Sequence, residues 1–216
     1  MPETRVNHPI FARFYARLSQ AMEHRGLAER RQKLLAGLSG QVIEVGAGNG
    51  LNFAHYPPAV TRVLAVEPEP RLRRLARTAA GAAPVPVEVV DGLADRLPAE
   101  DATFDGAVAS LVLCSLPNPD SALREMYRVL GPRGRLCFLE HVRAESAGMV
   151  RVQRLLDATV WPLLAGGCHT GRDSVAAIER AGFTVDRLER FMFPRVRTPA
   201  SFFVLGTASR APAVAG

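Results

Sequence analysis

The sequence predicts an α/β fold: a doubly wound, mostly parallel seven-stranded sheet, preceded by N-terminal helices and ended by an antiparallel hairpin. Short apolar runs alternate with amphipathic helical segments, which is typical of a parallel sheet covered by helices. The first buried run leads into a glycine-rich turn at 46–50. The last two runs are joined by residues 192–200, a connection too short for a crossover helix, so we expect them to pair antiparallel.

The length and composition indicate one globular domain. The chain has 216 residues, of which 48% are hydrophobic and 22% charged. No apolar run reaches the ~18 residues that a membrane span needs, and the N-terminus lacks a signal-peptide pattern, so we expect a cytoplasmic protein. We expect a helical lid at 1–39, the main domain at 40–208 and a disordered tail at 209–216.

The charge and the cysteines exclude several kinds of partner. The net charge is +6, and Lys33 is the only lysine. The arginines are interleaved with acidic residues and form no dense block with stacking aromatics, so we expect no specific nucleic-acid partner. Cys114, Cys137 and Cys168 are odd in number and widely spaced, which argues against a disulfide framework or a metal site. The oligomeric state is not indicated.

The N-terminal segment, residues 8–38, is predicted to be helical. Phe11, Phe14, Leu18 and Met22 recur at spacings of three and four and form one apolar face, and Gly26 should divide the segment into two helices. The face fits a lid packed over the substrate, which we favour, or a basic amphipathic helix in peripheral contact with a membrane.

The remaining elements follow in order. Asp120 is the expected N-cap of the second helix of the sheet region, and Gly131-Pro132 is its expected stop. A longer amphipathic helix within 144–170 should end near Trp161-Pro162. The expected strands are Gln41–Val45, Val63–Val66, Val85–Val90, Phe104–Ala109, Arg135–His141, Phe183–Phe191 and Ser201–Thr207. The other expected helices are Pro70–Ala80, Asp120–Leu130 and 171–182, the last stopped by Gly182.

The glycine-rich turn is the strongest functional signal. It follows a buried strand, and we expect it to open a helix whose N-terminus offers free N–H groups to a ligand. The spacing is G-x-G-x-G, and Leu51 stands where a dinucleotide fingerprint needs a small residue. A phosphate-binding G-K-[ST] is absent. Glu44, two residues before the first glycine, suits a ligand that has an ammonium group.

Two further acidic positions follow later strands. Glu67 ends the second strand, where a carboxylate can accept both hydroxyls of a ribose, and Asp91-Gly92-Leu93 follows the third strand, where it could contact an adenine edge. Each acid alone would be interpreted as a turn or helix cap. Together they lie at the carboxyl ends of successive strands, so they predict one nucleoside-binding crevice.

With these motifs the chain resembles the class I S-adenosylmethionine (SAM)-dependent methyltransferases, from about Gly40 to Thr207. The terminal hairpin is part of the likeness. The resemblance implies that Glu67 with Pro68 binds the ribose, and that Asp91, Gly92 and Leu93 bind the adenine. It also implies that the methionine part of SAM is surrounded by Glu44, Gly46, Ala47, Gly48, Asn49, Gly50, Asn52, Ser110 and Leu111.

A closer likeness concerns the acceptor. Asn52-Phe53, Tyr56-Pro57-Pro58, Leu111 to Leu116, Leu139 to Val142 and Gly167-Cys168-His169 resemble the methyltransferase-like thiol S-methyltransferases. Quinone C-methyltransferases and phospholipid N-methyltransferases share the glycine turn. The resemblance therefore implies transfer of a methyl group from SAM to a small hydrophobic acceptor, a thiol first, with O- or C-methylation of a phenolic or quinone-type ring or phospholipid N-methylation as alternatives.

Removal of the acceptor proton would need a base. His141, at the end of the fifth strand, is the first candidate, and His169 is the second. His55 is less well placed, and Cys114 is expected only to line the pocket. A structural role competes with the catalytic one for each histidine. Two other classes remain open at this point: a nicotinamide-dependent oxidoreductase and a non-catalytic SAM-binding protein.

Overall fold

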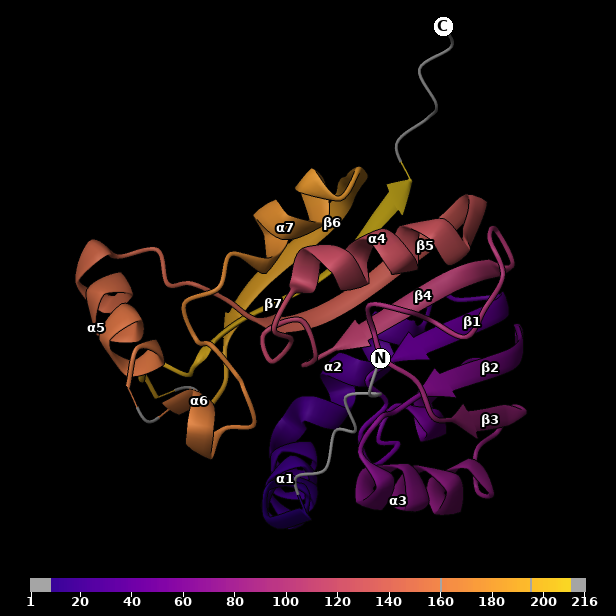
Figure 1. Ribbon diagram of the computed structural model, residues 1–216, viewed down its shortest axis with the longest axis horizontal. Coiled ribbons are helices and arrows are strands. Elements are labelled where there is room, and N and C mark those ends of the chain that lie inside the picture. Colours follow the sequence, from indigo (N-terminus) through magenta and orange to yellow (C-terminus); the bar gives the residue numbers. More distant parts are fainter. Residues whose placement is uncertain (1–8, 160, 195, 211–216) are drawn as a thin grey trace, which may run out of the picture.

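The computed structural model describes residues 9–159, 161–194 and 196–210, which form one seven-stranded sheet (Figure 1). The strand order is β3-β2-β1-β4-β5-β7-β6, and β7 runs antiparallel to both of its neighbours while the other pairs are parallel. The predicted fold class and the C-terminal hairpin are therefore confirmed. The strands are β1 (Gly40–Val45), β2 (Val60–Val66), β3 (Val87–Val90), β4 (Phe104–Ser110), β5 (Leu130–His141), β6 (Phe183–Met192) and β7 (Phe202–Arg210).

Helices precede the sheet and cover both of its faces. Gly26 has a φ of 111° inside a short π-helical turn, so it separates two N-terminal helices as predicted. Within the described residues no helix is long and apolar enough to cross a membrane. The helical elements are α1 (Pro9–Met22), η1 (Glu23–Leu27), α2 (Ala28–Leu35), η2 (Phe53–His55), α3 (Pro70–Ala80), α4 (Pro119–Val129), α5 (Ala147–Asp157), α6 (Trp161–Leu164) and α7 (Ser174–Arg180).

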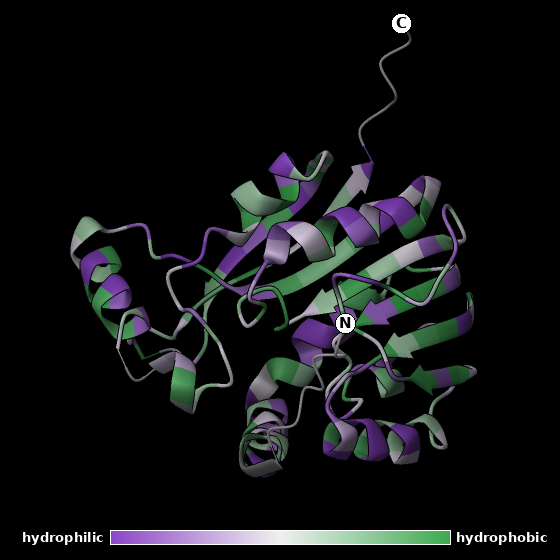
Figure 2. Cartoon of the chain, in the orientation of Figure 1, coloured by the Kyte–Doolittle hydropathy of each residue, from purple (hydrophilic) through white to green (hydrophobic). Residues whose placement is uncertain are grey.

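Two hydrophobic clusters hold the layers together. On one face, α4 and α7 pack through residues such as Met126 and Ile178 against Ile43 of β1. On the other face, α2 and η2 pack through Leu35 and Phe53. Both faces of the central strands are therefore buried, which explains why their sequences are continuously apolar. Figure 2 shows these strands mainly in green, with the hydrophilic residues of α3 and α4 turned outward.

The predicted helix after the glycine-rich turn is wrong. Only the three-residue 3-10 helix η2 lies between the turn and β2, and it contains His55. Tyr56 leaves it with extended backbone (ψ 129°), as expected for a residue before a proline, here Pro57. The ligand contacts of this loop therefore cannot come from an α-helix N-terminus.

The boundaries of two helices also differ from the prediction. The N-cap of α4 is Asn118, whose Oδ1 accepts a hydrogen bond from the Ser121 N–H at 3.1 Å, and not Asp120, which lies in the first turn. The long helix ends at Asp157, whose side chain accepts hydrogen bonds from the Thr170 and Gly171 N–H groups, and Trp161 instead begins α6.

The predicted C-terminal tail starts too early. β7 continues through Arg210, where Phe183 of β6 still pairs with it, so Ser209 and Arg210 belong to the sheet. Residues 211–216, the rest of the predicted tail, lie outside the described residues. The main domain therefore extends two residues beyond its predicted end at 208.

Helix α5 is attached through polar side chains, the Asp157 carboxylate at its end and the buried amide of Gln153. It stands with α6 to one side of the sheet (Figure 1), and Gln153 is the residue of α5 that is fully buried. Its Oε1 accepts from the Ala144 N–H at 2.8 Å, and its Nε2 donates to the carbonyls of Thr170 (3.0 Å) and Pro199 (2.9 Å). Leu155, on the predicted apolar face, is 69% exposed. Polar contacts therefore hold this helix.

We predict that Gln153→Leu loosens α5 without unfolding the sheet. The substitution leaves the Ala144 N–H and the carbonyls of Val142, Thr170 and Pro199 without this partner, which should cost about 1–3 kcal/mol. Hydrogen exchange followed by mass spectrometry should show faster exchange in 147–157 and unchanged protection in β1, β4 and β5. Val152→Ala on the exposed side of α5 is the control. Unchanged exchange of α5 in Gln153→Leu would contradict this account.

Candidate functional site

The sheet brings the predicted cofactor residues to one edge. β1 and β4 are neighbours, and the chain leaves them toward opposite sides, so the loops that follow them open a crevice at their carboxyl ends. The loop after β1 bends sharply: Gly46, Gly48 and Gly50 have φ values of 69°, 58° and 80°. A Cβ on Gly46 would lie 2.4 Å from Cγ2 of Val112, so the turn requires glycine there.

Glu67 joins this loop to the end of β2. Its Oε2 accepts a hydrogen bond from the Gly48 N–H at 2.7 Å, and its Oε1 accepts from the Glu69 N–H at 2.9 Å. Burial raises the pKa of Glu67 to about 7, although both N–H donors favour the ionised form. A carboxylate that touches the loop at this point can also accept hydrogen bonds from the hydroxyls of a bound nucleoside.

Glu44 lies behind the loop with two partners. Its Oε1 accepts from the Asn52 amide at 2.9 Å, and its Oε2 accepts from the Tyr56 hydroxyl at 2.6 Å. Burial raises the pKa of Glu44 to about 7 against these two donors. The structure thus brings the predicted residues Glu44 and Asn52 together. Tyr56 is a third member of the group. In the sequence it belongs only to the segment Tyr56-Pro57-Pro58 that resembles the thiol S-methyltransferases.

Arg31 of α2 completes this group, and no motif in the sequence points to it. Its guanidinium is buried, and its Nη1 donates to Oδ1 of Asn52 at 2.8 Å and to Oγ of Ser110 at 2.9 Å. Its Nε donates to Glu23 at 2.9 Å. In the sequence Arg31 is one of several charged residues of a helix, and nothing local distinguishes it from those on the surface.

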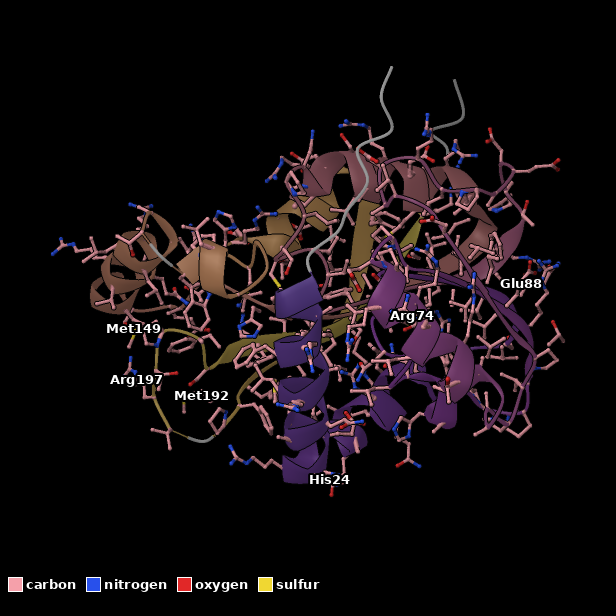
Figure 3. All side chains as sticks on the ribbon, turned by 60° about the horizontal axis from the view of Figure 1, so that its bottom comes forward. His24, Arg74, Glu88, Met149, Met192 and Arg197 are labelled. Atoms are coloured by element: carbon pink, nitrogen blue, oxygen red, sulfur yellow. The ribbon has the colours of Figure 1, made fainter. Side chains whose placement is uncertain are left out.

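Helix α1 lies across the glycine-rich loop. A Cβ on Gly48 would lie 3.3 Å from the ring of Tyr15, and the Asn49 amide donates to Oγ of Ser19 at 3.2 Å. Burial raises the pKa of Tyr15 to about 12. In Figure 3, α1 crosses the front of the molecule between α3, which bears the labelled Arg74, and Met192 at the end of β6. Helix α1 therefore packs on the glycine-rich loop, and its role as a lid over the substrate stays a prediction.

The predicted adenine residues form the outer part of the crevice. Asp91 is largely exposed, and its Oδ1 accepts from Arg73 at 3.0 Å. The same guanidinium donates to the carbonyls of Glu67 and Pro68 at 2.8 Å. Arg73 therefore fixes the chain that follows β2 next to the chain that follows β3. Gly92 packs on β2, and Leu93 pairs with Arg96 in an isolated bridge.

The loop after β4 is held by Glu140, which is fully buried at the end of β5. Its carboxylate accepts hydrogen bonds from the N–H groups of Val112 (3.0 Å), Leu113 (2.9 Å) and Cys114 (3.2 Å). At the start of this loop Leu111 has a φ of 59°, a strained conformation for a leucine. In the sequence, Glu140 belongs only to the segment Leu139 to Val142 that resembles the thiol S-methyltransferases. Its place as a carboxylate at the end of a strand could have indicated its role.

The two candidate histidines have different surroundings. The ring of His141 lies 4.1 Å from that of Phe203, and its buried Nδ1 has no hydrogen-bond partner in the described part of the chain. Burial lowers the pKa of His141 to about 4. Nδ1 of His169 lies 2.7 Å from the Gly167 carbonyl and 3.4 Å from Nη2 of Arg172, and the shorter contact, with a carbonyl that can only accept, favours the tautomer with the proton on Nδ1. The His55 ring instead contacts Glu23.

Two cysteines that are distant in sequence meet beside this loop. The His169 N–H donates to the Cys114 carbonyl at 2.9 Å, which brings the two segments together, and the interaction with Cys168 raises the pKa of the Cys114 thiol. All three cysteines are free. In the described ranges no group of three or more histidine, cysteine or acidic side chains could hold a metal ion.

Comparison with known proteins adds independent information. Residues 43–138 match the family model described as a methyltransferase domain. The chain is 39% identical over 165 residues to human thiol S-methyltransferase TMT1A, covering 74% of this chain and 67% of the relative. It is 34% identical over 182 residues to rat thiol S-methyltransferase TMT1B, covering 82% and 74%. A SAM-dependent methyltransferase from Thermotoga maritima shares the fold, with a TM-score of 0.68 at 21% identity, over 94% of this chain and 99% of that one.

We predict that affinity for SAM falls as the pH is lowered. The ionised forms of Glu44 and Glu67 are the ones that accept hydrogen bonds from an ammonium or a hydroxyl group, and both have pKa values of about 7. Between pH 7.5 and 5.5, protonation of one such group weakens binding by about tenfold or more. Calorimetric titration should show this fall, and Glu67→Gln should bind more weakly at pH 7.5 with a flatter pH profile. An affinity independent of pH would contradict the assignment of both carboxylates.

Proposed function

Because the chain belongs to the SAM-dependent methyltransferases, we propose that it transfers the methyl group of this cofactor to the sulfur of a small apolar thiol. The family membership rests on the relatives that match most of the chain, and it removes the oxidoreductase alternative. The names of these relatives, thiol S-methyltransferases TMT1A and TMT1B, support a thiol as the acceptor.

The observation that supports cofactor binding most directly is the contact between Glu67 and the N–H of Gly48. It places a buried carboxylate at the end of β2 in direct contact with the backbone of the glycine-rich loop. In the proposed arrangement Glu67 with Pro68 holds the ribose, and Asp91, Gly92 and Leu93 hold the adenine. The methionine part lies among Glu44, the loop 46–50, Asn52, Ser110 and Leu111. When bound, SAM supplies a methyl group already activated on a sulfonium.

The protein itself must then orient the acceptor and remove its proton. Orientation falls to the loop after β4, which Glu140 holds in one conformation. An ordinary thiol has a pKa of about 8.5, so a nearby base assists at neutral pH. We propose that Nε2 of His169 accepts this proton as sulfur takes the methyl group. The short contact of Nδ1 with the Gly167 carbonyl supports this assignment, because it favours the tautomer in which Nε2 accepts.

His141, the first candidate from the sequence, is assigned a different role in this proposal. A histidine whose pKa is lowered to about 4 is a poor acceptor for a thiol proton. It remains neutral, and its unpaired buried Nδ1 can form a hydrogen bond with a bound acceptor. We therefore propose that His141 positions the acceptor.

An assay of acceptor classes tests the proposed reaction. S-adenosylhomocysteine release should be measured with alkyl thiols, phenols, quinols and amines at matched concentrations. We expect apolar thiols to give the largest kcat/KM. Quinols or phenols as the best acceptors would indicate the ring-methylating alternative, and turnover of amines alone would show that the proposed acceptor is wrong.

We predict that the two histidine variants differ in their kinetics. His169→Ala should lower kcat with a thiol by roughly 10²–10⁴-fold, and alkaline pH should partly restore it because the thiol then ionises in solution. His141→Ala should mainly raise the KM for the thiol. Affinity for SAM, measured by titration, should remain nearly unchanged in both. The reverse pattern would assign the base to His141.

A further inference from the structure

In the proposed cofactor placement, on which this inference rests, the amino-acid end of SAM needs a partner for each of its two charged groups. We propose that Arg31 binds the α-carboxylate of SAM while Glu44 binds its α-ammonium group. The two side chains would then form a zwitterion-selective subsite at the inner end of the crevice. Arg31 lies on α2, before the segment 43–138 that matches the methyltransferase domain model.

The first observation is the burial of a charge. The Arg31 residue is only 4% exposed, although an arginine that is taken out of water loses much hydration energy unless it is paired. Its ion-pair partner is Glu23, bonded through Nε, and Glu23 is also 3.3 Å from Nε2 of His55. The remaining partners of Arg31, Asn52 and Ser110, are neutral.

The second observation is the unused donor capacity of the guanidinium. Its hydrogen bonds to described residues come from Nε and Nη1, and none comes from Nη2. A guanidinium has five N–H donors in a planar fork that matches a carboxylate. The Nη2 side therefore retains two donors for which a ligand carboxylate is a suitable partner.

The third observation is the position of Arg31 among the proposed cofactor residues. It bonds directly to Ser110 at the end of β4 and to Asn52, and the Asn52 amide bonds to Glu44. The Asn52 side chain thus lies between a guanidinium and a carboxylate, which can bind the opposite charges of one amino acid. Arg31 also lies close to Tyr15, whose ring rests on Gly48 of the loop: burial raises the pKa of Tyr15, and the charge of Arg31 partly opposes that rise.

A purely structural role predicts different behaviour. If Arg31 only attached α2 to β4, its loss would weaken all adenosyl ligands alike. If it binds the carboxylate, its loss should affect only ligands that have one. Decarboxylated SAM keeps the ammonium and the sulfonium but lacks the carboxylate, and 5′-methylthioadenosine lacks the whole amino-acid end. These ligands separate the two roles.

The experiment is a titration of SAM, decarboxylated SAM and 5′-methylthioadenosine into three proteins. We expect the wild-type protein to prefer SAM over decarboxylated SAM by roughly 10–100-fold, since a charged, bidentate hydrogen-bonded pair contributes about that much. Arg31→Met should reduce this preference to less than about threefold and leave 5′-methylthioadenosine binding unchanged. Arg30→Met is the matched control, because Arg30 lies next to it on α2 but pairs with Glu189 and stacks on Phe191.

Three results would overturn the proposal. They are an Arg31→Met protein that keeps the preference for SAM, one that binds all three ligands more weakly by the same factor, and an Arg30→Met protein that loses the preference. If Arg31→Met does not fold, Arg31→Lys, which keeps the charge without the fork, should show an intermediate preference, and an unchanged one would overturn the proposal. A wild-type protein that bound none of the ligands would instead refute the cofactor placement.

Discussion

The loops of the crevice are held in place by carboxylates buried at the carboxyl ends of strands. Glu67 accepts hydrogen bonds from the glycine-rich loop and from the chain after β2, and Glu140 accepts three from the loop after β4. Glu44 joins the end of β1 to Asn52 and Tyr56. Backbone N–H groups in a loop have no strand or helix partner, so these side chains supply the acceptors that the loops require.

This arrangement has an electrostatic cost that a ligand can offset. Burial raises the pKa of Glu44, Glu67 and Glu140 to about 7, above the ordinary value of a glutamate. Because the folded protein then binds more protons than the unfolded chain, these groups stabilise the fold at low pH, and that stability is lost as the pH rises through about 7. A ligand that supplies an ammonium and hydroxyl groups stabilises the ionised forms. The crevice is thus organised for a cationic, hydroxylated ligand at neutral pH.

The segments outside the central sheet complete the site in different ways. Helix α1 places Tyr15 and Ser19 on the glycine-rich loop, so the N-terminal helices belong to the proposed cofactor site as well as to the expected lid. Helix α5 is attached to the body through the Gln153 amide and leaves Leu155 in solvent. Helix α1 thus reaches the site through polar and ring contacts, α5 is held by polar side chains, and the sheet with α2, α4 and α7 is held by the two apolar clusters.

The sequence alone determined the positions of the strands along the chain, the hairpin and the glycine-rich loop, because periodicity and glycine spacing are local properties of the chain. It also identified Glu44 and Glu67 from their places at strand ends. It failed at the crossover after the loop, where Tyr56-Pro57 prevents a helix. Only the tertiary structure showed the contacts of Arg31, of Tyr15 and of the pair Cys114–Cys168. Each acts through a partner distant in sequence, and burial, which makes Arg31 differ from the exposed arginines, exists only after the sheet and α2 have packed together.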